Sequence, residues 1–289
     1  MEHHTIKISA AGIPEIDIAN AVELIIEFLS NNFSPVTRAI SDIMEFFFEM
    51  LVSSLLFFNP LVIIVAITII AWYVANRNNG IMAFLGLLLI WNMGLWEPTI
   101  ETISLVLIST IIAVGIGLPI GIIAALFSNA YKIIMPVLDF MQTMPAFVYL
   151  IPAIPFFGLG PVSATFSTVI FAMPPAIRLT CLGIRQLPVP LIEAADAFGS
   201  SRMQKLLKVQ LPLAMPTIMA GINQTIMLSL SMVVIAAMIG AGGLGSEVWK
   251  AIQRFKPGDG FEAGLGVVIV AIILDRITQQ IAKPEKQVK

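Results

Sequence analysis

The sequence predicts an all-α membrane protein with about seven transmembrane helices, preceded by one amphipathic helix. Its 289 residues are 58% apolar and only 12% charged, against about 25% charged residues in soluble domains. Long stretches carry no charge at all, and a helix needs about 20 apolar residues to cross a bilayer core. The charge-free stretches are 50–76, 78–96, 102–131, 140–177 and 209–246.

The stretch 140–177 is too long for one span, because a single helix of that length would extend about 57 Å. We predict a break at Gly158-Leu-Gly160-Pro161, where glycine and proline favour a turn. The predicted spans are 60–76, 80–96, 101–128, 133–157, 162–184, 212–238 and 263–282.

Basic residues predict the orientation. Arg77, Lys132, the 185–208 segment and the C-terminal lysines fall in alternate connections, which the positive-inside rule assigns to the cytoplasm. We therefore expect residues 1–58 outside, a transmembrane domain over 59–282, a cytoplasmic loop at 185–212 and a cytoplasmic tail at 283–289.

The segment 36–58 is predicted to be an interfacial helix. Asp42, Glu45 and Glu49 cluster on one side, opposite a side that includes Phe46 and Phe47, as in helices that lie at a membrane surface. The alternative is an eighth span, which would bury three carboxylates and reverse the N-terminus.

Motifs of catalysis and metal binding are absent. The sequence contains no H-E-x-x-H, no G-x-S-x-G, no Cys/His ligand spacing and no Walker A. Gly240 to Gly245 match G-x-G-x-x-G, but they follow a membrane helix rather than a strand, so a dinucleotide site is not expected. We predict no catalytic residue, no metal site and no cofactor on this chain, and ATP could act only through another polypeptide.

Small residues and prolines mark the middle of the predicted bundle. Gly117 and Gly121 have small-xxx-small spacing, which favours close helix packing within one subunit over a dimer contact. Prolines that interrupt membrane helices favour a solute path, although kinked packing is the alternative. They are Pro119, Pro145, Pro152, Pro155, Pro174 and Pro175.

Two charges are predicted to meet inside the membrane. Asp139 and Arg178 each lie about 10 Å from the cytoplasmic ends of adjacent helices. Equal depth predicts a buried structural ion pair at the cytoplasmic mouth.

The 185–212 loop is predicted to be a rigid elbow. Pro188 and Pro190 favour a helix start, Glu193 lies in its first turn, and Gly199 permits a left-handed turn. Ala194 and Ala195 would offer a small surface to a partner. A second short helix over about 200–208 then leads to the next span at Leu211-Pro212. The alternative is a surface loop without a partner.

The spacing of this loop resembles a known motif. Glu193-Ala-Ala, three residues, Gly199, nine residues and Val209-x-Leu211-Pro212 resemble the EAA motif of permease subunits of binding-protein-dependent ABC importers. Val209 stands where that family usually has isoleucine. The resemblance implies a coupling helix that docks in a groove of the ATPase subunit.

Further segments narrow the resemblance. Residues 141–152, 171–178, 221–232 and 236–245 are similar to the glycine betaine/proline betaine permeases, over roughly residues 55–282. This likeness implies the type I ABC importer permease fold in a prokaryotic cytoplasmic (inner) membrane. It also implies a homodimer in membrane lipids, ATPase subunits that hold ATP and Mg, an extracytoplasmic binding protein, and no nucleic-acid partner.

The implied substrate is a quaternary-ammonium compatible solute. The faces of aromatic rings attract such a cation. Candidate path residues are Met141, Met144, Phe147 and Tyr149, with ordinary packing as the alternative. A rival importer would carry choline, carnitine or an amino acid. An ion- or proton-coupled carrier would need a midplane carboxylate or a broken-helix ion site, and Asp139 is the one intramembrane acid expected away from helix ends. A membrane-embedded hydrolase would need a catalytic pair in the bilayer, and none is visible.

Overall fold

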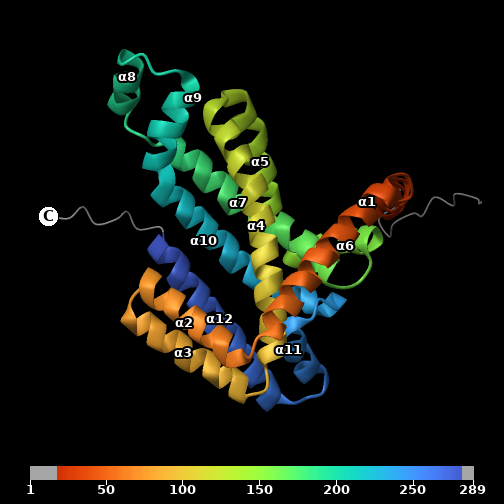
Figure 1. Cartoon of the computed structure of the whole chain (residues 1–289). Helices are drawn as coiled ribbons and strands as arrows, with labels where there is room; N and C mark the ends of the chain where they lie inside the picture. Colours follow the sequence, from red (N-terminus) through yellow and green to blue (C-terminus); the bar gives the residue numbers. More distant parts are fainter. Residues whose placement is uncertain (1–17, 282–289) are drawn as a thin grey trace, which may run out of the picture.

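The computed structural model describes residues 18–281, and within them the chain is helical, with no strand. Figure 1 shows short helices α8 and α9 at one end of the molecule and α11 at the other. The predicted tail 283–289, residue 282 of the last span and residues 1–17 lie outside the described part. The long helices are α1 (Ile18–Phe57), α2 (Pro60–Val74), α3 (Arg77–Asn92), α4 (Trp96–Leu126), α5 (Ser128–Thr143), α7 (Pro161–Arg185), α10 (Leu211–Ala236) and α12 (Pro257–Ile281).

Helix α7 forms the centre, packed between α4 and α10. A Cβ added at Gly117 would lie 3.0 Å from the Cβ of Ala176, and one at Gly121 would lie 2.7 Å from the Cβ of Thr180. The small-xxx-small pair therefore lets α4 approach α7 within one chain, as predicted. Cys181, the sole cysteine, is buried in this centre with 1% of its surface exposed.

Helices α2, α3 and α12 form a separate layer beside this centre (Figure 1). A Cβ at Gly80 of α3 would lie 3.0 Å from the Cβ of Trp72 on α2, and one at Gly86 would meet Ile269 of α12 at 2.7 Å. Glycines thus bring α3 close to both neighbours. The layer reaches the centre through contacts of α12 with α10.

Helices occupy all seven predicted ranges, but length and apolar composition alone do not assign every one of them to the membrane. Among the described residues, three helical segments are long and apolar enough: Trp96–Leu126, Pro161–Arg185 and Arg202–Ile239. The number rises to five if each of two bent pairs is one span. The seven-span topology therefore stays a prediction for α2, α3 and α12.

The expectation of one helix over 133–157 is wrong. The chain breaks at Met144-Pro145, and the segments Ser128–Thr143 and Ala146–Phe157 are bent by 111°. Pro145 has no N–H to donate and forces Met144 into an extended conformation, with ψ at 134°. The segment after the break comprises η1 (Ala146–Tyr149) and α6 (Leu150–Phe157). The other five prolines expected to interrupt helices lie within helices.

Helix α1 is longer than the predicted 36–58 segment, since it runs from Ile18 to Phe57. Asp42, Glu45, Glu49, Phe46 and Phe47 are all exposed. Helix α1 meets α2 at an angle of 102°, and Figure 1 shows its N-terminal part projecting from the bundle. Its position relative to a membrane surface stays a prediction.

Candidate coupling site

The coupling loop, residues 185–212, begins with helix α8 (Val189–Ala197). Gly199 follows it with φ at 74°, the left-handed conformation expected from the sequence. The N–H of Ser200 donates to the carbonyl of Ala195 at 3.1 Å, and that of Gly199 to Asp196 at 2.9 Å. These two bonds form a Schellman motif, which closes α8 and fixes the direction in which the chain leaves it.

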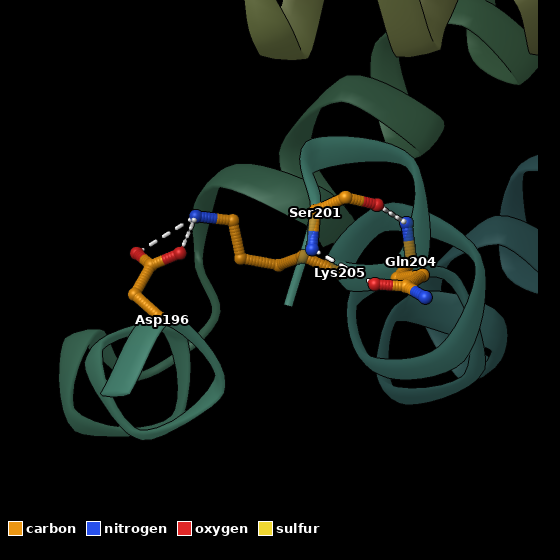
Figure 2. A network of polar contacts seen from close by, with 4 residues as sticks. All are labelled: Asp196, Ser201, Gln204 and Lys205. Carbon is orange, nitrogen blue, oxygen red and sulfur yellow. Dashed lines mark hydrogen bonds and ion pairs between the residues drawn. The ribbon is translucent and has the colours of Figure 1, made fainter. Parts of the chain in front are cut away.

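The turn after Gly199 is fixed by side chains (Figure 2). Ser201 and Gln204 form a capping box: the Gln204 N–H donates to Ser201 Oγ at 3.3 Å, and the Ser201 N–H donates to Gln204 Oε1 at 2.9 Å. Lys205 Nζ donates to both carboxylate oxygens of Asp196, at 2.6 and 2.8 Å. The ion pair ties α9 (Arg202–Lys205) back to α8 across the turn.

The second helix of the loop does not end before the next span. Helix α9 continues through a π-helical turn, η2 (Leu206–Gln210), into α10, so Arg202–Ile239 is one helical segment of 38 residues. The predicted separate helix over 200–208 is thus wrong, because Leu211-Pro212 lies inside the helix. Leu206 anchors the turn, packed with Ile184, Ala214 and Ile218.

The surface of the loop differs from the expected one at Ala195. Glu193 and Ala194 are exposed, but Ala195 is only 9% exposed and packs inside the loop. The surface open to a partner is enlarged by Phe198, which is 91% exposed. Leu211 is half-buried and Pro212 exposed. Aromatic residues are enriched at protein interfaces, so Phe198 is a candidate contact for a partner.

Asp139 and Arg178 lie near this end of the bundle and contact one another. Arg178 Nη2 is 2.6 Å from Asp139 Oδ1. The pair is not buried within the chain, since 37% of the Arg178 side chain and 64% of the Asp139 side chain are exposed. The two residues come together as expected, and the structural role of the pair stays a prediction.

The four candidate path residues surround the break at Pro145. Tyr149 is 6% exposed and packs edge-on against Phe171, with ring centroids 5.7 Å apart. Its hydroxyl donates to the Met141 carbonyl. Tyr149 is therefore a packing residue in this conformation, whereas Phe147 is exposed and Met141 and Met144 are half-buried.

A polar cluster between α10 and α12 was not predicted. Asn223 donates to Asp275 at 2.9 Å, and Thr278 donates to Asn223 at 2.7 Å. The expectation that Asp139 is the one acid away from helix ends is wrong, because Asp275 lies six residues before the end of α12. The charged pair Asp275-Arg276 within the predicted span 263–282 was the available signal.

The glycine-rich stretch Gly240–Gly245 joins α10 to α11 (Gly243–Gln253). The Gly243 N–H donates to the Glu101 carboxylate at 2.6 Å, and the Leu244 N–H donates to Thr102 Oγ1 at 2.8 Å. Two residues of α4 thus cap α11, and the glycines allow neighbouring segments to approach the start of α11 closely. Among the described residues, no group of three or more His, Cys, Asp or Glu side chains could hold a metal ion.

Solved structures show the same fold. The chain resembles inward-facing structures of the MetNI methionine ABC transporter with a TM-score of 0.61, over 65% of this chain and 94% of the matched one, at 23% identity. A second inward-facing crystal form gives a TM-score of 0.59. The architecture is that of a type I ABC importer permease.

Curated relatives match nearly the whole chain. It is 48% identical to the glycine betaine transport system permease protein OpuAB of Bacillus subtilis, over 95% of this chain and 97% of that protein. It is 49% identical to the glycine betaine/carnitine transport permease protein GbuB of Listeria monocytogenes, over 95% and 99%. ProW of Escherichia coli, a glycine betaine/proline betaine permease protein, is 46% identical over 90% and 74%.

Residues 117–283 match the family described as "Binding-protein-dependent transport system inner membrane component". This region contains the whole coupling loop, the flanking helices α7 and α10, and the second part of α4. The chain belongs to the family of binding-protein-dependent transport system inner membrane components.

Proposed function

We propose that this chain is the permease subunit of an ATP-driven importer of glycine betaine or a similar quaternary-ammonium solute. The observation that carries the proposal is the coupling loop. Its hydrogen-bonded turn presents exposed Glu193, Ala194 and Phe198, and it continues without a break into a helix of the bundle centre. Such an element converts a force from a docked partner into movement of a helix.

The chain itself performs no catalysis under this proposal. ATP and Mg bind to ATPase subunits that dock on the coupling loop. In this proposal 185–212 and 283–289 lie in the cytoplasm and 1–58 lies outside. A second copy of the permease completes the path, and an extracytoplasmic binding protein delivers the solute. The transmembrane domain spans 59–282. The Asp139–Arg178 pair stabilises the cytoplasmic mouth, and Met141, Met144 and Phe147 border the path.

The relatives support the choice of solute. Three permeases at 46–49% identity carry glycine betaine in their names, one of them together with carnitine and one with proline betaine. These solutes share a quaternary ammonium and a carboxylate. Carnitine is accordingly the second candidate.

Reconstitution tests the proposal. The chain is purified with an ATPase subunit, placed in vesicles, and given binding protein loaded with labelled glycine betaine. We expect uptake that requires ATP, the ATPase and the binding protein together. Uptake that proceeds without ATP contradicts the importer, and ATP-dependent uptake of an amino acid in preference to glycine betaine and carnitine contradicts the solute.

A further inference from the structure

The cluster between α10 and α12 is the polar contact that joins the bundle centre to the outer layer of α2, α3 and α12. Asn223 donates through Nδ2 to Asp275 Oδ1 at 2.9 Å, while its Oδ1 accepts from the Thr278 hydroxyl at 2.7 Å. Gln279 Nε2 donates to the same Asp275 oxygen at 2.7 Å. Both ends of the Asn223 amide are therefore engaged by α12.

The position of Asn223 connects the cluster to the coupling loop. It lies on the segment Arg202–Ile239, which starts in the coupling loop and has no break before Asn223. The Asp196–Lys205 ion pair ties α8 to the start of this segment. A displacement of α8 therefore reaches Asn223 through the turn with its Asp196–Lys205 pair, and then along one continuous helical segment.

Helix α12 carries the movement onward. It packs on α2 and α3, with Ile269 seated against Gly86. The same helix places buried Ile273 and half-buried Leu274 and Ile277 in the hydrophobic core. Apolar surfaces slide past each other at small cost in a lipid environment, whereas a hydrogen-bonded pair in that environment holds one register.

We propose that Asn223 and Asp275 are positioning residues that lock α12 to α10, so that movement of the coupling loop also displaces the α2–α3–α12 layer. This inference rests on the proposed importer function. A carboxylate in a membrane helix is retained where it has a partner and a role. Here its role is to accept hydrogen bonds across the helix interface.

The test measures solute imported per ATP hydrolysed in reconstituted vesicles. Asp275→Leu and Asn223→Leu are expected to lower this ratio about tenfold, a typical size for coupling between two sites. The control Arg276→Gln removes the neighbouring exposed charge and should leave the ratio unchanged. The thiol of buried Cys181 reports whether each variant is folded, because it reacts with a dye when the bundle opens.

Two further variants separate hydrogen bonding from charge. Asp275→Asn keeps an acceptor for Asn223 and Gln279, and the swap N223D/D275N exchanges donor and acceptor between the helices. Both are expected to restore the ratio to within about twofold of the wild type, the usual limit of additivity.

Each result decides the proposal. An unchanged ratio in both leucine variants overturns it, as does a swap or an Asp275→Asn variant that transports no better than they do. If the leucine variants fail to fold, the swap and Asp275→Asn decide alone. Wild-type vesicles without ATP-dependent uptake would instead contradict the proposed function itself.

Discussion

Within the coupling loop, at one end of the bundle, side-chain bonds join residues three to nine positions apart. At the opposite end, the bonds that cap α11 join residues 142 positions apart, from Glu101 to Gly243 and from Thr102 to Leu244. The turn of the coupling loop is held by its own neighbours in sequence, and the start of α11 by a distant helix.

This difference separates two kinds of rigidity. The bonds of the coupling loop can persist when the loop moves as a unit, because all their partners lie within one short segment of the chain. The bonds at α11 persist only while α4 and α11 stay in contact. The coupling loop can therefore move as one unit, whereas the bonds at α11 would break if α4 and α11 separated.

The largest effect is expected from Gly243→Ala at the start of α11, where the capping bonds are long-range in sequence. Gly243 has φ at 73°, and an added Cβ would lie 2.5 Å from Thr102 Oγ1. Left-handed strain and steric overlap together should lower the free energy of unfolding by about 3 kcal/mol. The measurement is the midpoint of thermal unfolding, followed through the reactivity of the Cys181 thiol.

The matched control is Gly94→Ala. Gly94 also has φ at 73°, but no atom lies within 4 Å of an added Cβ. It isolates the backbone strain and should cost less. Equal losses at both positions would show that the overlap with Thr102 adds nothing to the backbone strain.

The next effect is expected from Gly199→Leu in the coupling loop. A leucine at φ of 74° costs about 1–2 kcal/mol, so the turn that presents Phe198 becomes less populated by a factor of roughly 5–30. ATP-dependent uptake should fall by that order while the helices stay intact. Gly94→Leu carries the same strain far from the loop and should keep its uptake; a matching loss there would contradict the coupling role of Gly199.

A smaller effect is expected from Thr102→Val, which removes one of the bonds that cap α11. The Leu244 N–H would lose its acceptor in a buried setting, at a cost of about 1 kcal/mol. Thr102→Ser keeps the hydroxyl and should retain most of the stability. Thermal unfolding of the pair distinguishes the hydrogen bond from the packing of the methyl group, and a serine variant as unstable as the valine variant would assign the effect to packing.

The smallest effect is expected at the Asp196–Lys205 pair. More than half of the Asp196 side chain is exposed, and ion pairs at surfaces contribute less than about 1 kcal/mol. A double-mutant cycle of Asp196→Asn and Lys205→Met gives the interaction energy, which should fall further at high salt. A coupling that salt does not change would mean that the pair is shielded from solvent.

The contrast between short-range and long-range bonds also explains which features the sequence predicted. The turn at Gly199 rests on local backbone chemistry, and it forms as predicted. The cap of α11 by Glu101 and the Asn223–Asp275 bond join segments 142 and 52 residues apart. No pattern in a single sequence indicates which helices will face each other there.

Pro145 was expected to interrupt a helix, but the sharp bend that separates α5 from α6 there was not. Gly158-Leu-Gly160-Pro161 already divided the long apolar stretch into lengths that fit a bilayer, so a second break was not needed to satisfy length. Only the packing of Tyr149 beneath Met141 shows that the chain folds back on itself at Pro145. Similarly, the burial of Ala195 follows from how α8 lies against α9, which the motif alone does not reveal.

The unbroken course of Arg202–Ile239 makes this segment a lever. Thirty-eight residues of helix span about 57 Å, so a tilt of about 5° at the loop end displaces the far end by about 5 Å, close to one helical turn. The pivot position then sets the ratio of the two arms. A substitution that shifts the pivot along α10 would change the stroke at the far end without touching either the loop or the solute.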